Sequence, residues 1–363
     1  MSSVIVPLTT IESVEPHPNA DRLEVAKISG WQVVVGKGTY QAGDPVIYVP
    51  PDALVPQEWS DRWGVTAYLS NGRVRSIKLR GEPSFGFSVK PGVEEYAALA
   101  QDGMVIPLEY GDVIDDVSSA FGITKYVPQP SATRIQNARN EDPRLARFTD
   151  IENLRHYGSG FTEGEAVVVT EKIHGTCSRL ALIEGEYMAA SKRVQRDRDI
   201  TEADDIQFST SCRDTYWFPL SVPGVNELLV DFGKRHKQVI LFGEIYGPSI
   251  QKGFDYGVQP GELGYVAFDL MLDGKYVDAE QFEGIREEYG LTGAPTLYAG
   301  PYDAAKIKGL TKGRSTLGGS HIREGVVVRS ATEQRHPKFG RKVLKLVSDE
   351  FLTGNNEDLQ ETA

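Results

Sequence analysis

The chain has 363 residues, an apolar fraction of 40% and a formal net charge of −12. This length allows two domains with cores of their own, and the acidic balance argues against a protein that binds nucleic acid through its overall charge. A local basic groove remains compatible with it. Two cysteines, Cys177 and Cys212, give no disulfide framework and no zinc-ligand spacing, which fits a reducing compartment. The N-terminus lacks the pattern of a signal peptide, and no run of about 18 apolar residues occurs. We therefore expect a soluble, cytoplasmic protein without a membrane contact.

The first third of the chain is rich in short strands separated by glycine and proline turns. Residues 4–8, 23–28, 32–35 and 45–49 have the β-branched and apolar composition of strands. Short strands at this spacing predict a small β-barrel or sandwich over residues 1–126. We expect the rings of Trp31, Tyr40 and Tyr48 to lie in its core.

Three runs in this part resemble an OB-fold, and they begin at His17, Val33 and Gly43. They are similar to the OB modules that accompany tRNA-binding proteins and one branch of RNA ligases. A strip of four basic residues follows, at Arg73, Arg75, Lys78 and Arg80. On such a barrel the strip either tracks a phosphate backbone or forms an ordinary solvated strand edge.

Residues 127–143 contain three prolines and no periodicity, which predicts a linker between two domains. Apolar residues then recur at every third position from Leu145 to Leu154, which favours one or two short helices. Residues 225–235 also have a helical period. The acidic run at 202–205 carries no functional signal, and the last residues, 352–363, are predicted to be a polar tail.

Residues 167–190 contain three apolar runs, separated by a polar turn at 171–176 and by the hairpin signal Glu184-Gly185-Glu186, a pattern typical of antiparallel strands. Lys172 lies where the first run ends, and Gly175 is expected to let the backbone come close to a ligand. Burial and nearby cations both favour the neutral form of a lysine, which is a nucleophile. By itself this pattern is equally compatible with a solvated loop lysine.

Further motifs follow in a fixed order, and together with Glu171-Lys172-Ile173-His174-Gly175-Thr176 they resemble the covalent nucleotidyltransferases. That superfamily comprises DNA ligases, RNA ligases and mRNA-capping enzymes. The match is closest to the RNA ligase 2-like family, in the branch with an N-terminal OB domain, because DNA ligases and capping enzymes usually have Asp where His174 stands. The further motifs are Lys192-Arg193, the strand ending at Glu244, Phe268-Asp269, Glu324-Gly325 and Lys342 to Val347.

The resemblance implies an α+β fold, with the OB-like barrel followed by a nucleotidyltransferase domain built on antiparallel sheets over residues 144–351. It also implies an ATP-dependent RNA ligase that seals 3′-hydroxyl and 5′-phosphate ends, with lysyl-AMP and adenylylated RNA as intermediates. RNA repair is the expected context, and ATP with Mg²⁺ or Mn²⁺ are the expected cofactors. Positioning and charge stabilisation are the main demands of such phosphoryl chemistry.

The resemblance also assigns roles to individual residues. Lys172 is the nucleophile, Lys345 stabilises the charge that develops on the α-phosphate, and Lys342 is the other lysine of the last motif. That pair is three residues apart here, whereas the family separates its two lysines by one residue. Glu324 and Glu244 are the expected metal ligands, and Glu244 is alternatively the partner of the ribose hydroxyls. The remaining nucleotide-site residues are Phe268 as the adenine stacker, Lys192 and Arg193 as phosphate contacts, and Glu171, His174 and Gly175 of the first motif.

RNA is the expected partner, as a nicked duplex, as broken ends or as an RNA–DNA hybrid, and the protein is expected to be a monomer. Arg335, His336, Lys338, Arg341 and Lys342, with Arg193, Arg196 and Arg198, are predicted to form a basic groove for it. Two alternatives stay open at this point. One is a DNA ligase or a GTP-using capping-type enzyme, and the other is an RNA-binding protein with a decayed catalytic domain.

Overall fold

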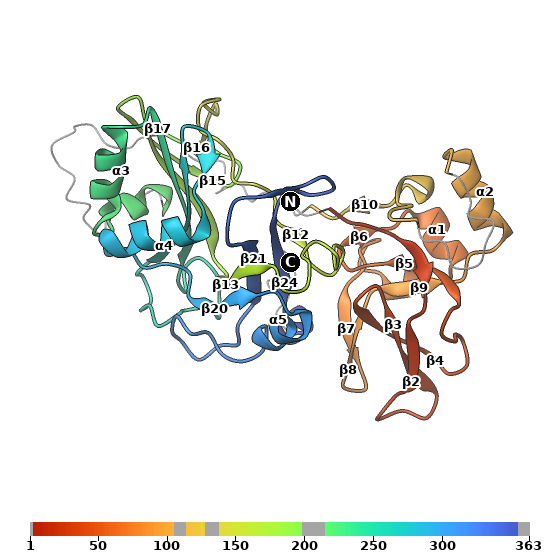
Figure 1. Cartoon of the computed structure of the whole chain (residues 1–363). Helices are drawn as coiled ribbons and strands as arrows, with labels where there is room; N and C mark the ends of the chain where they lie inside the picture. Colours follow the sequence, from red (N-terminus) through yellow and green to blue (C-terminus); the bar gives the residue numbers. More distant parts are fainter. Residues whose placement is uncertain (1–2, 105–113, 128–137, 198–214, 355–363) are drawn as a thin grey trace. The chain divides into compact units, whose positions relative to one another are not determined.

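The computed structural model describes residues 3–104, 114–127, 138–197 and 215–354, and the chain divides into two compact units (Figure 1). Unit 1 takes the described residues of Met1–Gln129, Glu152–Gly158 and Leu352–Ala363, and unit 2 takes those of Pro130–Ile151 and Ser159–Phe351. Most of the predicted linker and of the predicted tail lies outside the described residues, as do Arg198 and the acidic run at 202–205.

Unit 1 is built from short antiparallel strands with a few short helices. Its strands pair in the orders β1-β5-β9, β2-β3-β4, β7-β8 and β6-β10. The elements are β1 (Leu8–Thr10), β2 (Ser13–Pro16), β3 (Leu23–Ile28), β4 (Trp31–Gly36), β5 (Pro45–Val49), β6 (Ala53–Leu54), α1 (Gln57–Arg62), η1 (Thr66–Tyr68), β7 (Ser76–Leu79), β8 (Glu82–Phe85), β9 (Phe87–Val89), α2 (Val93–Gln101), η2 (Ser119–Phe121), β10 (Thr124–Lys125) and β12 (Glu152–Asn153). Strands β3 and β5 have the predicted bounds. The strand expected at residues 4–8 begins only at Leu8, because the backbone of Val6 instead bonds to Asp116 and Val117.

The predicted basic strip of unit 1 does not form as a continuous surface. Arg73 is buried, pairs with Asp52 at 2.7 Å, and lies over the ring of Tyr126. Lys78 and Arg80 remain exposed on the β7–β8 hairpin. Trp31 and Tyr48 are buried as expected.

Unit 2 contains a seven-stranded antiparallel sheet in the order β11-β16-β15-β14-β17-β18-β19. Its strands are β11 (Ala138–Arg139), β14 (Thr176–Ile183), β15 (Glu186–Ser191), β16 (Gln195–Arg196), β17 (Gln238–Tyr246), β18 (Gly264–Leu272) and β19 (Lys275–Tyr276). The predicted turn at Glu184-Gly185 joins β14 to β15, and both residues adopt the positive φ of a tight hairpin.

A second sheet of unit 2 holds β24, β21, β13 and β20 side by side. Its strands are β13 (Ala166–Lys172), β20 (Thr296–Pro301), β21 (Gly325–Ser330) and β24 (Val343–Val347), and a small hairpin of β22 (Arg335–His336) and β23 (Gly340–Arg341) connects β21 to β24. The helical elements are η4 (Thr215–Ser221), α3 (Val225–Gly233), α4 (Ala279–Glu288), α5 (Ala304–Leu310) and α6 (Asp349–Leu352).

The seven-stranded sheet is apolar on both faces. Helices α3 and α4 cover one face (Figure 1). On that face Leu228, Phe232 and Phe282 pack against alternate residues of β14, β17 and β18. The other face carries a second cluster, in which Leu145 and Phe148 pack against β14, β17 and β18. The helix predicted over residues 225–235 is confirmed as α3.

The helices predicted between Leu145 and Leu154 do not form, and the sequence-based interpretation was wrong there. Residues 141–151 run in an extended, turn-rich course. The side chain of Arg179 accounts for part of this, because it binds the main-chain carbonyls of Leu145 and Ala146 that a helix would use internally. The three-residue spacing instead places Leu145 and Phe148 against one sheet.

Candidate active site

Strand β13 ends at Lys172, which pairs with Gly325 on β21, and Gly325 pairs in turn with Val347 on β24. Lys345 on β24 pairs with Val327 on β21, and Val327 pairs with Thr170 on β13. Because side chains alternate along a strand, Thr170 and Lys172 lie on one face of the sheet, and Lys345 lies on that face too. Gly325 is required here, since an added Cβ would approach the carbonyl oxygen of Leu346 to 2.3 Å. The fold therefore brings two lysines far apart in the sequence to one face.

Glu324 is the centre of the polar group beside Lys172. Its Oε1 lies 2.5 Å from Lys172 Nζ, and its Oε2 lies 3.5 Å from His174 Nδ1. The side chain of Glu324 is fully buried, so desolvation favours its neutral form, but Lys172 and His174 outweigh this and hold the pKa of the Glu324 carboxyl below its usual range. An ionised, inward-facing carboxylate thus holds the lysine at the strand end.

Glu244 approaches the same group from β17, opposite Cys177 on β14. Desolvation raises the pKa of the Glu244 carboxyl to about 8, and the negative charge of Glu324 adds to the rise. The positive charge of Lys172 and a hydrogen bond from the Gly175 N–H oppose it. Gly175 must be glycine, because a Cβ there would lie 2.3 Å from the carbonyl oxygen of Ile245. The sequence predicted that Gly175 would let the backbone approach a ligand, whereas the close contact in the structure is with β17.

His174 is buried, with 1% of its surface exposed, and it does not face solvent. Its ring meets those of Phe254 and Phe351 edge-on at 4.7 and 5.3 Å, and its main-chain N–H donates to the Tyr256 hydroxyl at 2.6 Å. The sequence offered no carboxylate partner for this histidine, and the structure supplies Glu324. No sequence signal points to Tyr256, since the two residues are 82 positions apart.

Two of the expected site residues lie away from this group. Glu171 precedes Lys172 on β13 and so faces the other side of the sheet, where it accepts hydrogen bonds from the N–H and hydroxyl of Thr316. Lys342 precedes β24 and donates to Glu165 at 2.7 Å. Of the two lysines of the last motif, the structure brings only Lys345 to the face of Lys172.

The expected nucleotide contacts occupy the seven-stranded sheet. Lys192 follows β15 and pairs with Asp150 at 2.7 Å, a partner that the sequence analysis missed. Arg193 beside it is exposed. Phe268 lies at a bulge of β18, in the cluster on the face away from α3 and α4, with its ring edge-on to Phe148 at 5.0 Å.

The predicted basic groove is reduced by internal ion pairs. Arg341 is buried between Asp269 and Glu333, and Arg196 is also buried. The groove residues that remain exposed are Arg193 and, around the β22–β23 hairpin, Arg335 and Lys338.

The two carboxylates are the residues best suited to a divalent cation. Both oxygens of Glu324 are buried and lack a hydrogen bond of regular geometry within the described residues. Glu324 lies close enough to Glu244 for its charge to help raise the pKa of the Glu244 carboxyl. Magnesium bound to phosphates typically takes one or two carboxylates and keeps several waters. In the described residues no group of three or more His, Cys, Asp or Glu side chains is arranged to hold a metal ion by itself.

Comparison with known families decides the identity of unit 2. Residues 165–347, half of the chain, match the sequence model of the RNA ligase family. The chain belongs to the RNA ligase family. Residues 5–91 match a model of an OB-fold domain, which confirms the expected barrel of unit 1 and the α+β class.

Solved RNA ligases from Naegleria gruberi share this fold. A lysine-to-alanine variant with ATP and Mn is 20% identical, with 96% of this chain and 98% of that chain covered and a TM-score of 0.72. The Naegleria ligase with PPi is also 20% identical, with 97% and 98% covered and a TM-score of 0.69. No curated protein sequence matches the chain significantly. None of the helices in the described parts of this RNA ligase is both long enough and apolar enough to cross a bilayer.

Proposed function

We propose that this member of the RNA ligase family is an ATP-dependent ligase that joins a 3′-hydroxyl to a 5′-phosphate of RNA through AMP bound covalently to Lys172. The observation that carries the proposal is the setting of Lys172, which ends a strand beside the buried, ionised Glu324 and shares a sheet face with Lys345. The Naegleria ligases of the same fold were solved with ATP or AMP and Mn.

In the first step the Lys172 amine attacks the α-phosphorus of ATP, an N–P bond forms, and pyrophosphate leaves as the Pα–O bond breaks. The Lys172 ammonium must lose a proton for this attack, and the ionised Glu324, whose Oε1 lies 2.5 Å from Nζ, would orient the amine and accept that proton. Lys345 places a positive charge on the same face, where negative charge grows on the phosphoryl oxygens. Glu324 and Glu244 are the residues that would hold a divalent cation, which would supply further charge neutralisation at the phosphates.

We assign the adenosine to the face of the seven-stranded sheet that carries Phe268 and Glu244. Phe268 offers its ring to the adenine, and Glu244 is positioned for the ribose hydroxyls or for metal-bound water. Lys192, which Asp150 holds in place, would contact a phosphate. Glu171 and Lys342 are left out of this assignment because their partners, Thr316 and Glu165, lie elsewhere.

The acceptor follows from the same chemistry. AMP moves from Lys172 to the 5′-phosphate of RNA, and the 3′-hydroxyl then displaces AMP. We propose RNA repair at nicked duplexes, broken ends or RNA–DNA hybrids by a cytoplasmic monomer, with an OB-fold domain over residues 1–126 and a nucleotidyltransferase domain over residues 144–351. The exposed cations Arg193, Arg335 and Lys338 are the residues of unit 2 proposed to contact the phosphate backbone.

The test is transfer of label from α-labelled ATP to the protein with Mg²⁺ or Mn²⁺, read on a denaturing gel and located by peptide mapping. The protein is first stripped of AMP with pyrophosphate. We expect label on Lys172, none in Lys172→Ala, and wild-type labelling in Lys234→Ala, a matched change of an ion-paired surface lysine just after α3.

Each alternative predicts a different result in the same assay. Label from GTP alone would indicate a capping-type enzyme, and sealing of nicked DNA but not of nicked RNA would indicate a DNA ligase. Absence of label with either metal would refute covalent nucleotidyl transfer and leave RNA binding as the function.

A further inference from the structure

Arg179 on β14 is a buried arginine that binds the protein's own main chain at several points. Its side chain is 0% exposed, although arginines are rarely buried without a structural demand. Nε donates to the carbonyl of Ser191 at 2.8 Å, and Nη1 donates to the carbonyls of Leu145 and Ala146 at 3.0 and 3.4 Å. Nη2 lies 2.7 Å from Glu141 Oε1. The guanidinium therefore joins the 141–148 segment to the end of β15.

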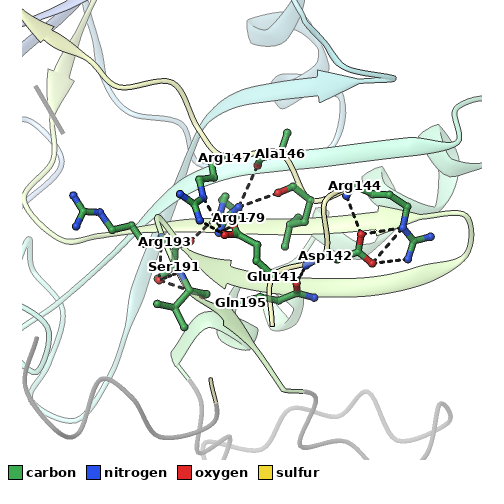
Figure 2. A network of polar contacts seen from close by, with 11 residues as sticks. Glu141, Asp142, Arg144, Ala146, Arg147, Arg179, Ser191, Arg193 and Gln195 are labelled. Atoms are coloured by element: carbon green, nitrogen blue, oxygen red, sulfur yellow. Dashed lines mark hydrogen bonds and ion pairs between the residues drawn. The ribbon is translucent and has the colours of Figure 1, made fainter. Parts of the chain in front are cut away.

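The 141–148 segment is held at further points along its length (Figure 2). Glu141 also accepts from Arg147, the N–H of Asp142 donates to the side chain of Gln195 at 2.6 Å, and Gln238 donates to the carbonyl of Arg144 at 2.6 Å. The segment therefore has a fixed course across the sheet. It precedes residues 165–347, the part of the chain that matches the family model.

This clamp fixes the position of one aromatic ring, that of Phe148. Phe148 is 7% exposed, and its ring centroid lies 5.0 Å from that of Phe242, 5.0 Å from that of Phe268 and 5.9 Å from that of Tyr276. It meets Phe268 edge-on, which is a favourable geometry for two aromatic rings. Phe268 is only partly buried, so Phe148 supports one side of a ring that remains accessible on another.

We propose that Arg179 and Phe148 are positioning residues of the nucleotide site, and that the 141–148 segment forms part of its wall. Arg179 fixes the main chain at Leu145 and Ala146, this sets the ring of Phe148, and Phe148 in turn sets the ring of Phe268 against which adenine stacks. The proposal rests on the proposed function, because it takes Phe268 as the adenine stacker. Neither residue touches the reacting phosphate, so both act on binding of ATP and not on the chemical step.

The experiment measures the single-turnover rate of Lys172 labelling against ATP concentration in Arg179→Lys, in Phe148→Leu and in the double variant. The maximal rate constant is written kcat, and the ATP concentration at half that rate is written KM. We expect each single change to raise KM by about fivefold to tenfold, with kcat within about twofold, because an oriented aromatic pair contributes on that scale. The double variant should show nearly the KM of the stronger single one, since both changes disturb the same ring.

Arg286→Lys is the matched control. Arg286 on α4 also binds a main-chain carbonyl, that of Leu291 at 2.8 Å, and a carboxylate, that of Glu283. We expect it to lower the melting temperature without changing KM for ATP. If Arg179→Lys does not fold, Phe148→Leu decides the question alone, since it keeps an apolar side chain in the cluster.

The outcomes separate the two proposals. If the wild type takes no label, the proposed function is wrong and this inference falls with it. If the wild type is labelled but both single variants keep the wild-type KM, only the positioning role is overturned. A fall in kcat at unchanged KM, or KM increases that multiply in the double variant, would equally contradict it.

Discussion

The carboxyl of Glu244 makes a pH-dependent prediction about the stability of unit 2. Desolvation raises its pKa from an ordinary value of 4.5 to about 8, although Lys172, the Gly175 N–H and Lys192 oppose the rise. Replacing this residue in Glu244→Gln keeps the shape of the side chain and removes its titration. The variant should therefore differ from the wild type by an amount that depends on pH.

The sign follows from proton binding in the folded and unfolded states. Between pH 4.5 and about 8 the folded protein holds a proton on Glu244 that the unfolded chain has released. The stabilisation from this proton is complete below the unfolded pKa and is lost as the pH rises through the folded pKa. A pKa difference of about 3.5 corresponds to about 5 kcal/mol. Residue Glu244 is only half-buried, and its contact with solvent reduces this to about 2–3 kcal/mol.

The assay is calorimetric unfolding of the wild type and of Glu244→Gln between pH 5 and pH 9, in EDTA and without nucleotide. The stability of the variant relative to the wild type should increase by about 2–3 kcal/mol over this range. Glu280→Gln, an exposed glutamate on α4, is the control and should show no such trend. A difference that stays constant with pH, or one that grows on acidification, would refute the reasoning.

Three further changes have expected outcomes. Lys345→Ala should lower the rate of labelling from ATP by about a hundredfold or more, as loss of a charge-stabilising group does. Lys342→Ala should keep the labelling rate within about fivefold of the wild type, because Lys342 forms its ion pair with Glu165, away from Lys172. Equal losses of the two variants in single-turnover labelling would contradict the assignment. Gly175→Ala should abolish labelling and lower the melting temperature, because its Cβ would lie 2.3 Å from a carbonyl oxygen of β17; an unchanged melting temperature would contradict this. Arg335→Ala with Lys338→Ala should weaken RNA binding in fluorescence anisotropy and lower the salt slope by about 1–2, and an unchanged slope would remove the hairpin from the RNA interface.

The order of the motifs indicated the family, but not the contacts among their residues. Lys172 and Gly175 could be singled out because a strand end followed by a glycine turn is a local pattern. The pairing of Glu324 with both Lys172 and His174 could not be predicted, because it joins residues about 150 positions apart through the register of β13 and β21. Lys342 and Lys345 are chemically equivalent in the sequence, and only the alternation along β24 separates them.

The segment before the ligase motifs shows the limit of periodicity most clearly. Its three-residue spacing of apolar residues is compatible with a helix, and the sequence contains no sign that Arg179 will bind its carbonyls. Local patterns depend on neighbouring residues, whereas this contact depends on a buried guanidinium from β14.

The sequence by itself determined the two-part organisation, the strand-rich character of both parts, the hairpin at Glu184-Gly185 and the candidate nucleophile Lys172. These depend on composition, turn chemistry and short-range alternation, which are readable along one chain. Only the tertiary structure decided which charged residues are buried and paired, because ion pairs such as Arg341 with Asp269 form between strands brought together by folding. The sequence predicts a continuous basic groove for RNA, but in the described structure Arg196 and Arg341 are buried and only some of its cations are exposed.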